Sequence, residues 1–183
     1  MNFVTLDFET AQYSRDSACA IGLVKFEGGK ETDSYYSLIR PPELYIRPDF
    51  TALHGLTVDD VKDAPVFSEI WKNVESFIGS FPIAAHNAGF DMGVLKAVLE
   101  KYGLTSGRLR YFCTLALSRN TWRGMSSYSL KNLGASFDIS YTAHNALHDA
   151  RTCGALVCLA AQKLARSDVK GTLKAARVVL KRF

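Results

Sequence analysis

The sequence contains no apolar run that approaches the roughly 20 residues of a membrane-spanning helix, so we expect no membrane span. It opens on a strand-like pattern, without the basic and apolar regions of a secretory signal peptide, and we expect no such signal. Internal repeats and low-complexity tracts are also absent. Cysteine is scarce, and the four residues have the spacing of neither a zinc module nor a small secreted disulfide framework. These absences favour free buried thiols and a cytoplasmic protein.

The length of 183 residues fits a single domain with a full core, because 48% of the residues are apolar and 22% are charged. We expect one domain over residues 1–166. Over 167–183 we expect a basic C-terminal helix that packs on this domain or extends from it. Residues 163–183 hold seven basic residues and one acid, whereas the rest of the chain holds 15 basic and 17 acidic residues. Such a tail is either a solvated helix face or a contact for nucleic acid.

The order of the predicted elements indicates an α/β fold. Three strands come first, and Glu27-Gly28-Gly29-Lys30 marks a hairpin turn between the second and the third. Two short strands then alternate with helices, which is typical of a mixed sheet with helices on its faces. We expect a five-stranded sheet, a three-strand antiparallel meander plus two crossover strands, at about residues 4–10, 18–26, 32–39, 81–85 and 109–113. Helices are expected at about 65–78, 146–164 and 169–181, and prolines predict an extended surface loop near 41–48.

The stretch from Val4 to Thr10 alternates apolar and polar residues, which predicts a strand with two different faces. Asp7 and Glu9 lie two positions apart and therefore share one face, where their charges repel. A semi-buried pair of carboxylates is costly unless a cation neutralises it. A hard divalent metal ion such as Mg²⁺ would serve, because it takes oxygen ligands. The alternative is a solvent-facing edge strand with two unremarkable acids.

Two further acids occupy places typical of ligand sites. Asp91 follows a strand and begins a helix, which is where α/β proteins bind ligands. It could instead only complement the dipole of that helix. Asp149 lies in a helix among mostly apolar neighbours, so its charge needs a partner, with Arg151 as the simplest alternative to a metal ion.

Four acids on three separate elements could hold two magnesium ions roughly 4 Å apart, a pair suited to phosphodiester hydrolysis. That chemistry also needs a base near neutral pH, and histidine has the right intrinsic pKa. His144 precedes Asp149 by five positions, in a loop just before the helix. His148 points about 100° away from Asp149 on the same helix, so we interpret it as peripheral.

The ordered set Asp7-x-Glu9, His86-Asn87-Ala88-Gly89-Phe90-Asp91 and His144-x4-Asp149 resembles the three motifs of the DEDDh group of 3′→5′ exonucleases, the DnaQ-like exonucleases. That group includes the proofreading epsilon subunit of bacterial DNA polymerase III and ribonuclease T. Leu53-His54-Gly55-Leu56-Thr57 also resembles its segment between the first two motifs. The resemblance covers about residues 2–165. One departure is Thr10-Ala11-Gln12, where many members have Thr-Thr-Gly.

The resemblance implies a ribonuclease H-like fold, two Mg²⁺ or Mn²⁺ ions per site, and release of nucleoside 5′-monophosphates from 3′ ends. The implied metal ligands and catalytic acids are Asp7, Glu9, Asp91 and Asp149, and the implied general base is His144. Thr10 would hold the terminal nucleotide through its backbone, Leu56 would wedge against the terminal base, and His54 and Phe90 would line the same pocket.

The expected substrate is a single-stranded 3′ end. DNA is favoured because the whole-chain pattern leans toward the proofreading subunit, and an exoribonuclease of the ribonuclease T type is the alternative. A second alternative is an accessory module that docks on a polymerase, or associates with itself, through the C-terminal helix. Leu173, Ala176 and Leu180 would form the apolar stripe for that contact.

Overall fold

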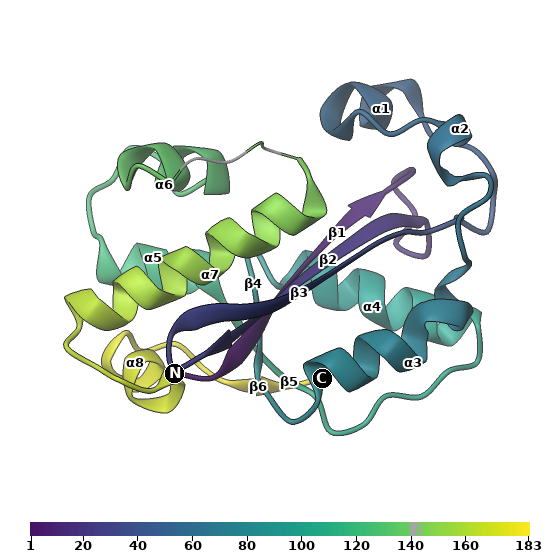
Figure 1. Ribbon diagram of the computed structural model, residues 1–183. Helices are drawn as coiled ribbons and strands as arrows, with labels where there is room; N and C mark the ends of the chain where they lie inside the picture. The colour runs from purple at the N-terminus through teal and green to yellow at the C-terminus, as the bar shows by residue number, and fades with distance from the viewer. Residues whose placement is uncertain (140–141, 143) are drawn as a thin grey trace.

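The computed structural model describes residues 1–139, 142 and 144–183. Its centre is a six-stranded mixed sheet in the order β3-β2-β1-β4-β5-β6, with helices on both faces (Figure 1). The predicted α/β architecture and the central place of the first strand are therefore confirmed. The sequence predicts five strands, which is one fewer than the structure has.

The antiparallel half of the sheet is the predicted meander of β1 (Phe3–Thr10), β2 (Ala18–Glu27) and β3 (Lys30–Leu38). Gly28 and Gly29 turn the β2–β3 hairpin with φ of 60° and 82°, values that suit residues without a Cβ. The register of β1 against β2 shifts between Glu9 and Thr10. Such irregularities re-aim side chains at the end of a strand.

The parallel half consists of β4 (Ile83–Ala85) and β5 (Arg110–Cys113), joined through α4 (Gly89–Lys101). α3 (Phe67–Ile78) precedes β4. Because β1, β4 and β5 run in the same direction, their carboxyl ends meet at one edge of the sheet, the edge at which α/β proteins bind ligands.

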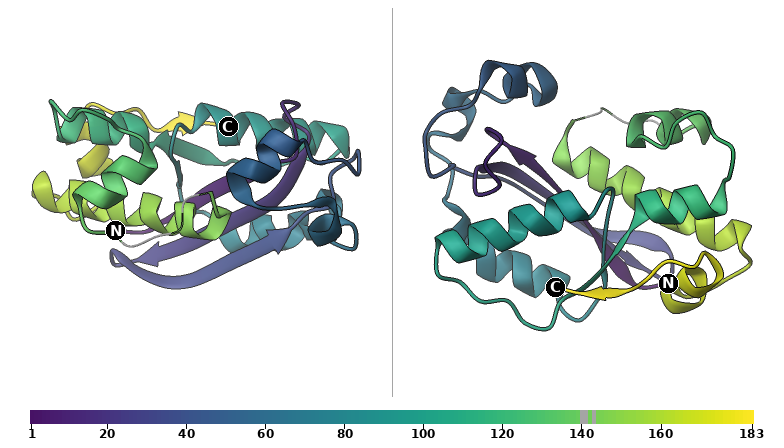
Figure 2. Two further views of the ribbon diagram at one scale, coloured as in Figure 1. Left: turned by 90° about the horizontal axis from the view of Figure 1, so that it is seen from above. Right: turned by 180° about the vertical axis from the view of Figure 1, so that it is seen from behind.

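The alternation of β1 divides the core into two layers. Val4, Leu6 and Phe8 pack in the layer covered by α3 and α4, whereas Phe3 packs with the helices on the other face. Those helices are α5 (Thr114–Thr121), α7 (Ala146–Lys163) and α8 (Val169–Ala175). Three short helices complete the fold: α1 (Pro48–His54), α2 (Val58–Val61) and α6 (Leu130–Ser136). α1 and α6 stand on either side of the end of β1 (Figure 2).

Two glycines allow α7 to lie close to the sheet. A Cβ on Gly22 of β2 would collide with the backbone of Ala146 at the start of α7. A Cβ on Gly154 within α7 would collide with the ring of Phe26. Gly22 is paired with Asp7 in the β1–β2 ladder, so the close approach of α7 occurs directly beside that carboxylate.

The C-terminal segment differs from its prediction. Its helix ends at Ala175, because Arg177 adopts φ of 54° and the N–H of Val178 donates back to the carbonyl of Leu173 over 2.8 Å. Lys181 and Arg182 then form β6, which pairs antiparallel with β5 and is the sixth strand. A two-residue strand carries no periodic signal, which explains why pattern analysis missed it.

The apolar stripe expected to dock on a partner is used by the domain itself. Leu173 and Ala176 are buried against the α5 and α7 layer, and Leu180 packs on the same cluster. The stripe is therefore not a free docking surface. Among the residues that the structure describes, no helix is both long and apolar enough to cross a membrane.

The segment predicted as an extended loop runs directly into α1, which begins at Pro48. Pro48 stands at its first helical position, where the missing N–H costs nothing because that donor has no partner within the helix. The proline therefore opens a helix here, and this helix forms one wall of the candidate active site.

Candidate active site

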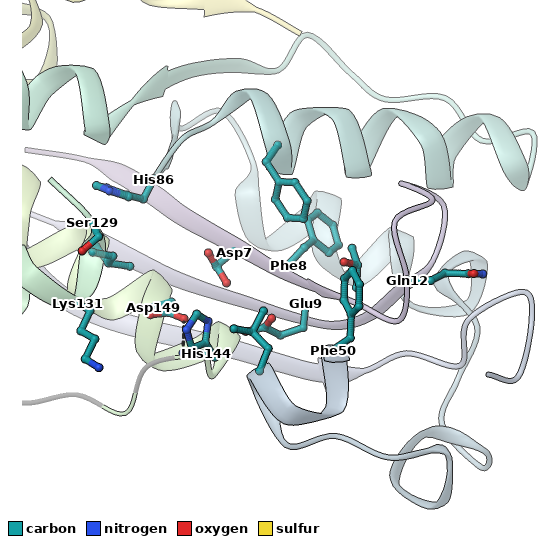
Figure 3. Close-up of a pocket in the computed structure, with 14 residues that line it drawn as sticks. Asp7, Phe8, Glu9, Gln12, Phe50, His86, Ser129, Lys131, His144 and Asp149 are labelled. Atoms are coloured by element: carbon teal, nitrogen blue, oxygen red, sulfur yellow. Dashed lines mark hydrogen bonds between the residues drawn. The ribbon is translucent and has the colours of Figure 1, made fainter. Parts of the chain in front are cut away.

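Three carboxylates gather between the end of β1 and the start of α7. Asp7 and Glu9 project from the β1 face that α7 covers, as the alternation predicts, and Asp149 projects from the first turn of α7. One carboxylate oxygen from each residue lies within 4.8 Å of the others (Figure 3). Glu9 and Asp149 are buried, and Asp7 is partly exposed to the cavity beside them.

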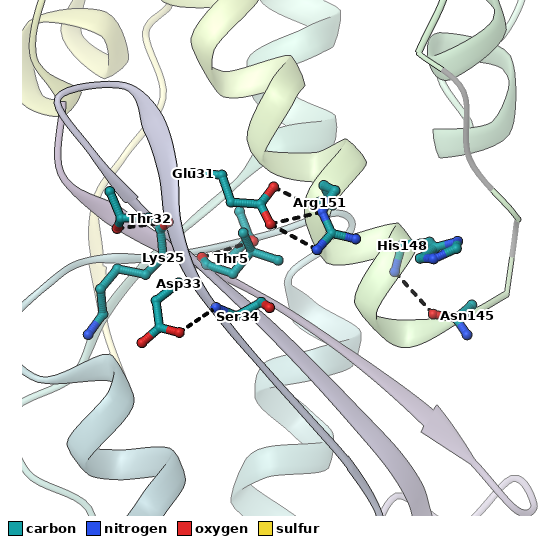
Figure 4. A network of polar contacts seen from close by, with 10 residues as sticks. Thr5, Lys25, Glu31, Thr32, Asp33, Ser34, Asn145, His148 and Arg151 are labelled. Carbon is teal, nitrogen blue, oxygen red and sulfur yellow. Dashed lines mark hydrogen bonds and ion pairs between the residues drawn. The ribbon is translucent and has the colours of Figure 1, made fainter.

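The start of α7 is fixed by hydrogen bonds around Asp149. Asn145 caps the helix, because its side-chain oxygen accepts the N–H of His148 over 3.2 Å (Figure 4). One carboxylate oxygen of Asp149 accepts the N–H of His144 over 2.9 Å. Asp149 therefore ties the loop before the helix to the acidic cluster. Arg151, the alternative partner for Asp149, pairs instead with Glu31 at 2.8 Å (Figure 4).

Asp91 joins the site from the opposite side of β1. β4 pairs with β1 only as far as Thr5, so the backbone N–H of Phe8 has no strand partner there. Asp91, in the first turn of α4, accepts that N–H over 3.2 Å through Oδ1. Its other carboxylate oxygen is buried and has no hydrogen-bond partner among the described residues. A buried carboxylate oxygen without a hydrogen-bond partner destabilises the folded protein unless a cation binds next to it.

The four carboxylates are mutually destabilised as anions. Burial raises the pKa of Asp7 well above its usual value, and the charges of Asp91 and Asp149 raise this pKa further. Burial and the charge of Asp149 raise the pKa of Glu9 to about 8. Burial also raises the pKa of Asp91 to about 7 and that of Asp149 to about 6.

This donor set suits a divalent metal ion. All four side chains offer oxygen ligands, which hard divalent cations prefer. The raised pKa values and the unpartnered oxygen of Asp91 both indicate that a bound cation would stabilise the cluster. No described basic side chain forms an ion pair with any of the four acids. Asp7, Glu9 and Asp149 therefore lie together, and Asp91 contacts the same strand through the N–H of Phe8. That the four acids hold metal ions stays a prediction.

The cavity beside the acids has two chemically different ends. Its volume is about 520 Å³. Phe50 lies at one end, and His86, Ser129 and Lys131 lie at the other, with the carboxylates between them (Figure 3). Leu53, one turn after Phe50 in α1, and Phe90 also line the cavity. His144 lines the same cavity, and its side chain is exposed. The arrangement provides an apolar recess, an acidic centre and a polar exit.

The four predicted substrate contacts fall into two groups. Thr10 and Phe90 line the cavity, whereas His54 and Leu56 do not. Leu56 packs on a separate apolar cluster behind α1. Sequence reasoning missed Phe50 and Leu53, which line the cavity. The available signal was their i, i+3 spacing in a helix opened by proline, which puts both side chains on one face.

His54 supports the pocket from behind. Its Nδ1 accepts the N–H of Leu56 over 3.1 Å, so the proton of the neutral ring is on Nε2. That N–H donates to the carbonyl oxygen of Thr10 over 3.2 Å. Burial lowers the pKa of His54, which keeps the ring neutral. His54 thus holds the backbone of Thr10 in place at the end of β1.

The comparisons with known proteins agree with this geometry. The model of the RNase_T exonuclease family matches residues 4–157. The chain belongs to this exonuclease family. The exonuclease match spans all of the acids in the cluster as well as His144.

Curated relatives of this exonuclease domain are much longer proteins. The chain is 30% identical over 183 residues to DNA polymerase III PolC-type of Caldanaerobacter subterraneus subsp. tengcongensis, covering 98% of this chain and 13% of that protein. It is 30% identical over 164 residues to the 3′-5′ exonuclease DinG of Staphylococcus epidermidis, covering 88% of this chain and 18% of that protein. The chain therefore spans less than a fifth of the length of either relative.

Solved exonuclease structures share the fold. Exonuclease X in complex with 5′ overhanging duplex DNA matches with a TM-score of 0.77 at 24% identity, covering 95% of this chain and 99% of that chain. The nuclease domain of 3′hExo, a DEDDh family member bound to rAMP, matches with a TM-score of 0.78 at 15% identity, covering 88% and 92%. The predicted ribonuclease H-like architecture is thus confirmed as that of the exonuclease fold.

Proposed function

We propose that this chain is a metal-dependent 3′→5′ exonuclease that releases nucleoside 5′-monophosphates from single-stranded 3′ ends, preferentially of DNA. The observation that carries the proposal is the convergence of four destabilised carboxylates beside a cavity with an apolar recess. Family membership supports the same reaction class.

Asp7, Glu9, Asp91 and Asp149 would hold two divalent ions, with Mg²⁺ or Mn²⁺ as the chemically suitable choices. When bound, such ions supply Lewis-acid stabilisation of the negative charge that develops during phosphodiester hydrolysis. The orphaned oxygen of Asp91 and the unpaired charges of the other acids are the features that fit these ions.

The protein's own groups account for proton transfer. His144 lines the cavity next to the acids, and its ring is the candidate general base for the attacking water. The hydrogen bond from its backbone N–H to Asp149 positions this residue over the acidic cluster. One carboxylate would thus serve both as ligand and as anchor for the base.

The apolar recess fits the terminal nucleoside. Phe50, Leu53 and Phe90 leave exposed apolar surface at this end, with Leu53 50% and Phe90 39% exposed. Aromatic and apolar side chains of this kind stack on or pack against a base without selecting its sequence. Thr10, held by His54, would contact the same nucleoside through its backbone. The recess accommodates an unpaired terminal base.

The name of the PolC-type relative favours DNA and a polymerase context for this chain. The rAMP bound to the DEDDh nuclease domain of 3′hExo favours RNA as the second candidate substrate. In either case the proposed place of action is the cytoplasm, where free thiols such as those of Cys19 and Cys153 are stable.

The test uses matched DNA and RNA oligonucleotides labelled at the 5′ end or the 3′ end, with Mg²⁺ or with a chelator. We expect a ladder of shortening 5′-labelled products, immediate release of labelled mononucleotide from the 3′ end, and no reaction with chelator. Internal cleavage products, or shortening from the 5′ end, would refute the proposal. The initial rates on the matched DNA and RNA oligonucleotides decide which of the two is the preferred substrate.

A further inference from the structure

A second hollow continues from the polar end of the active-site cavity. Its volume is about 730 Å³, and it shares His86, Ser129 and Leu130 with that cavity. The two hollows therefore adjoin each other at these residues. The part beyond the shared residues is called the exit groove here, and it is lined by Asn87, Leu115, Arg119, Ser126, Ser127 and Tyr128.

The wall of the exit groove is held in place by Tyr128. The Nε2–H of His86 donates to the carbonyl oxygen of Tyr128 over 2.9 Å. The hydroxyl of Tyr128 donates to the carbonyl of Trp122 over 2.6 Å and accepts the N–H of Met125 over 3.3 Å. Three hydrogen bonds thus fix the connection between α5 and α6, so its polar groups are arranged before any ligand binds.

The lining of the exit groove suits a chain of phosphates. Arg119 lies in the last turn of α5, is exposed, and places its guanidinium 5.9 Å from the ring centre of Tyr128. Ser126, Ser127 and Ser129 add hydroxyl groups. Among the described residues that line the groove there is no carboxylate. A guanidinium surrounded by hydroxyl donors binds phosphate oxygens well.

The geometry of the active site sets the direction of a bound strand. If the terminal base fills the apolar recess and its phosphate meets the carboxylates, the rest of the strand must leave past His86 and Ser129 (Figure 3). This path leads directly into the exit groove. We infer that the exit groove binds the phosphate backbone of the nucleotides on the 5′ side of the scissile bond, with Arg119 as its principal cation. The inference rests on the proposed exonuclease function and adds a strand-binding subsite to it.

The test compares a substrate that reaches the groove with one that does not. The first is a 5′-fluorescein single-stranded decanucleotide, and the second is the p-nitrophenyl ester of thymidine 5′-monophosphate, which fills only the terminal site. For Arg119→Gln we expect the ratio of kcat/KM for the decanucleotide to that for the ester to fall about tenfold, mainly through KM. The slope of log affinity against log salt for the decanucleotide should decrease by about 0.7, the value for one phosphate contact on a single strand.

Arg123→Gln is the matched control, because it removes the same charge from an exposed arginine on the same connection that does not line the groove. It should leave both the ratio and the salt slope unchanged. An unchanged ratio for Arg119→Gln, or an equal fall for Arg123→Gln, would overturn the inference. Failure of the proposed function looks different, since the wild type would then cleave neither substrate. In that case, decanucleotide binding by fluorescence anisotropy with Ca²⁺ still decides whether Arg119 holds the strand.

Discussion

Replacing Glu9 with glutamine should stabilise the metal-free protein at alkaline pH while abolishing its nuclease activity. The glutamine keeps the shape of the side chain and removes its charge. Burial and the neighbouring Asp149 raise the pKa of Glu9 from 4.5 to about 8. The folded protein therefore holds a proton that the unfolded chain releases, so its stability falls as the pH rises from about 4.5 through about 8.

The expected size follows from the two pKa values. Their difference corresponds to about 5 kcal/mol at about 1.4 kcal/mol per pKa unit, and the whole penalty is present above pH 8. Glu9 is only 8% exposed, so the new amide is buried and costs about 1–3 kcal/mol where its hydrogen bonds are incomplete. We therefore expect Glu9→Gln to raise the free energy of unfolding at pH 9 by about 2–4 kcal/mol, and to lower it by about 1–3 kcal/mol at pH 4, where the wild-type carboxyl group is already neutral.

The assay is urea unfolding of the wild type and the variant in EDTA, at pH 4, 6 and 9. Mg²⁺ added at pH 9 should stabilise the wild type more than the variant, because bound cations offset the same repulsion. A variant that is less stable than the wild type at pH 9, together with no effect of Mg²⁺ on the wild type, would show the charges of this cluster to be already compensated. The reasoning about a cation site would then be wrong.

Four further predictions concern single substitutions. Asp7→Ala should abolish nuclease activity and leave the circular dichroism spectrum unchanged, since it removes a ligand and relieves repulsion; wild-type cleavage would refute its role. His144→Ala should lower kcat by about 10²–10⁴-fold with Mn²⁺ binding retained in calorimetry, and an unchanged kcat would place the base elsewhere. Gly22→Ala should lower the free energy of unfolding by at least about 2 kcal/mol and weaken metal binding, because its Cβ displaces the start of α7. Gly107→Ala is the control and should change neither property, since a Cβ there makes only an ordinary van der Waals contact. Phe90→Ala should raise KM for oligonucleotides about tenfold through lost stacking, and unaltered KM would remove the residue from the pocket.

The acidic site was accessible from the sequence because each acid is tied to a strong local pattern. Asp7 and Glu9 share a face through strand alternation, and Asn145 marks the start of the helix that carries Asp149. The short distance between these elements was not accessible. It depends on Gly22, whose role arises from a helix more than 120 residues later in the chain. A glycine in a strand signals close approach only after its neighbour is known.

The substrate pocket was harder to predict for a similar reason. The prolines up to Pro48 favour an extended loop in the sequence, and this signal conceals the helical face that Phe50 and Leu53 share. His54 follows in the same helix but turns toward the carbonyl of Thr10 instead of the cavity. The exit groove depends on long-range hydrogen bonds of Tyr128, which leave no periodic trace in the sequence.

The central claim is that carboxylates from three distant parts of the chain hold divalent ions together. Anomalous diffraction from crystals grown with Mn²⁺ tests it most directly. We predict two peaks, each within about 2.5 Å of carboxylate oxygens of the cluster formed by Asp7, Glu9, Asp91 and Asp149. Fully occupied Mn²⁺ peaks elsewhere on the molecule, with none at this cluster, would contradict the account.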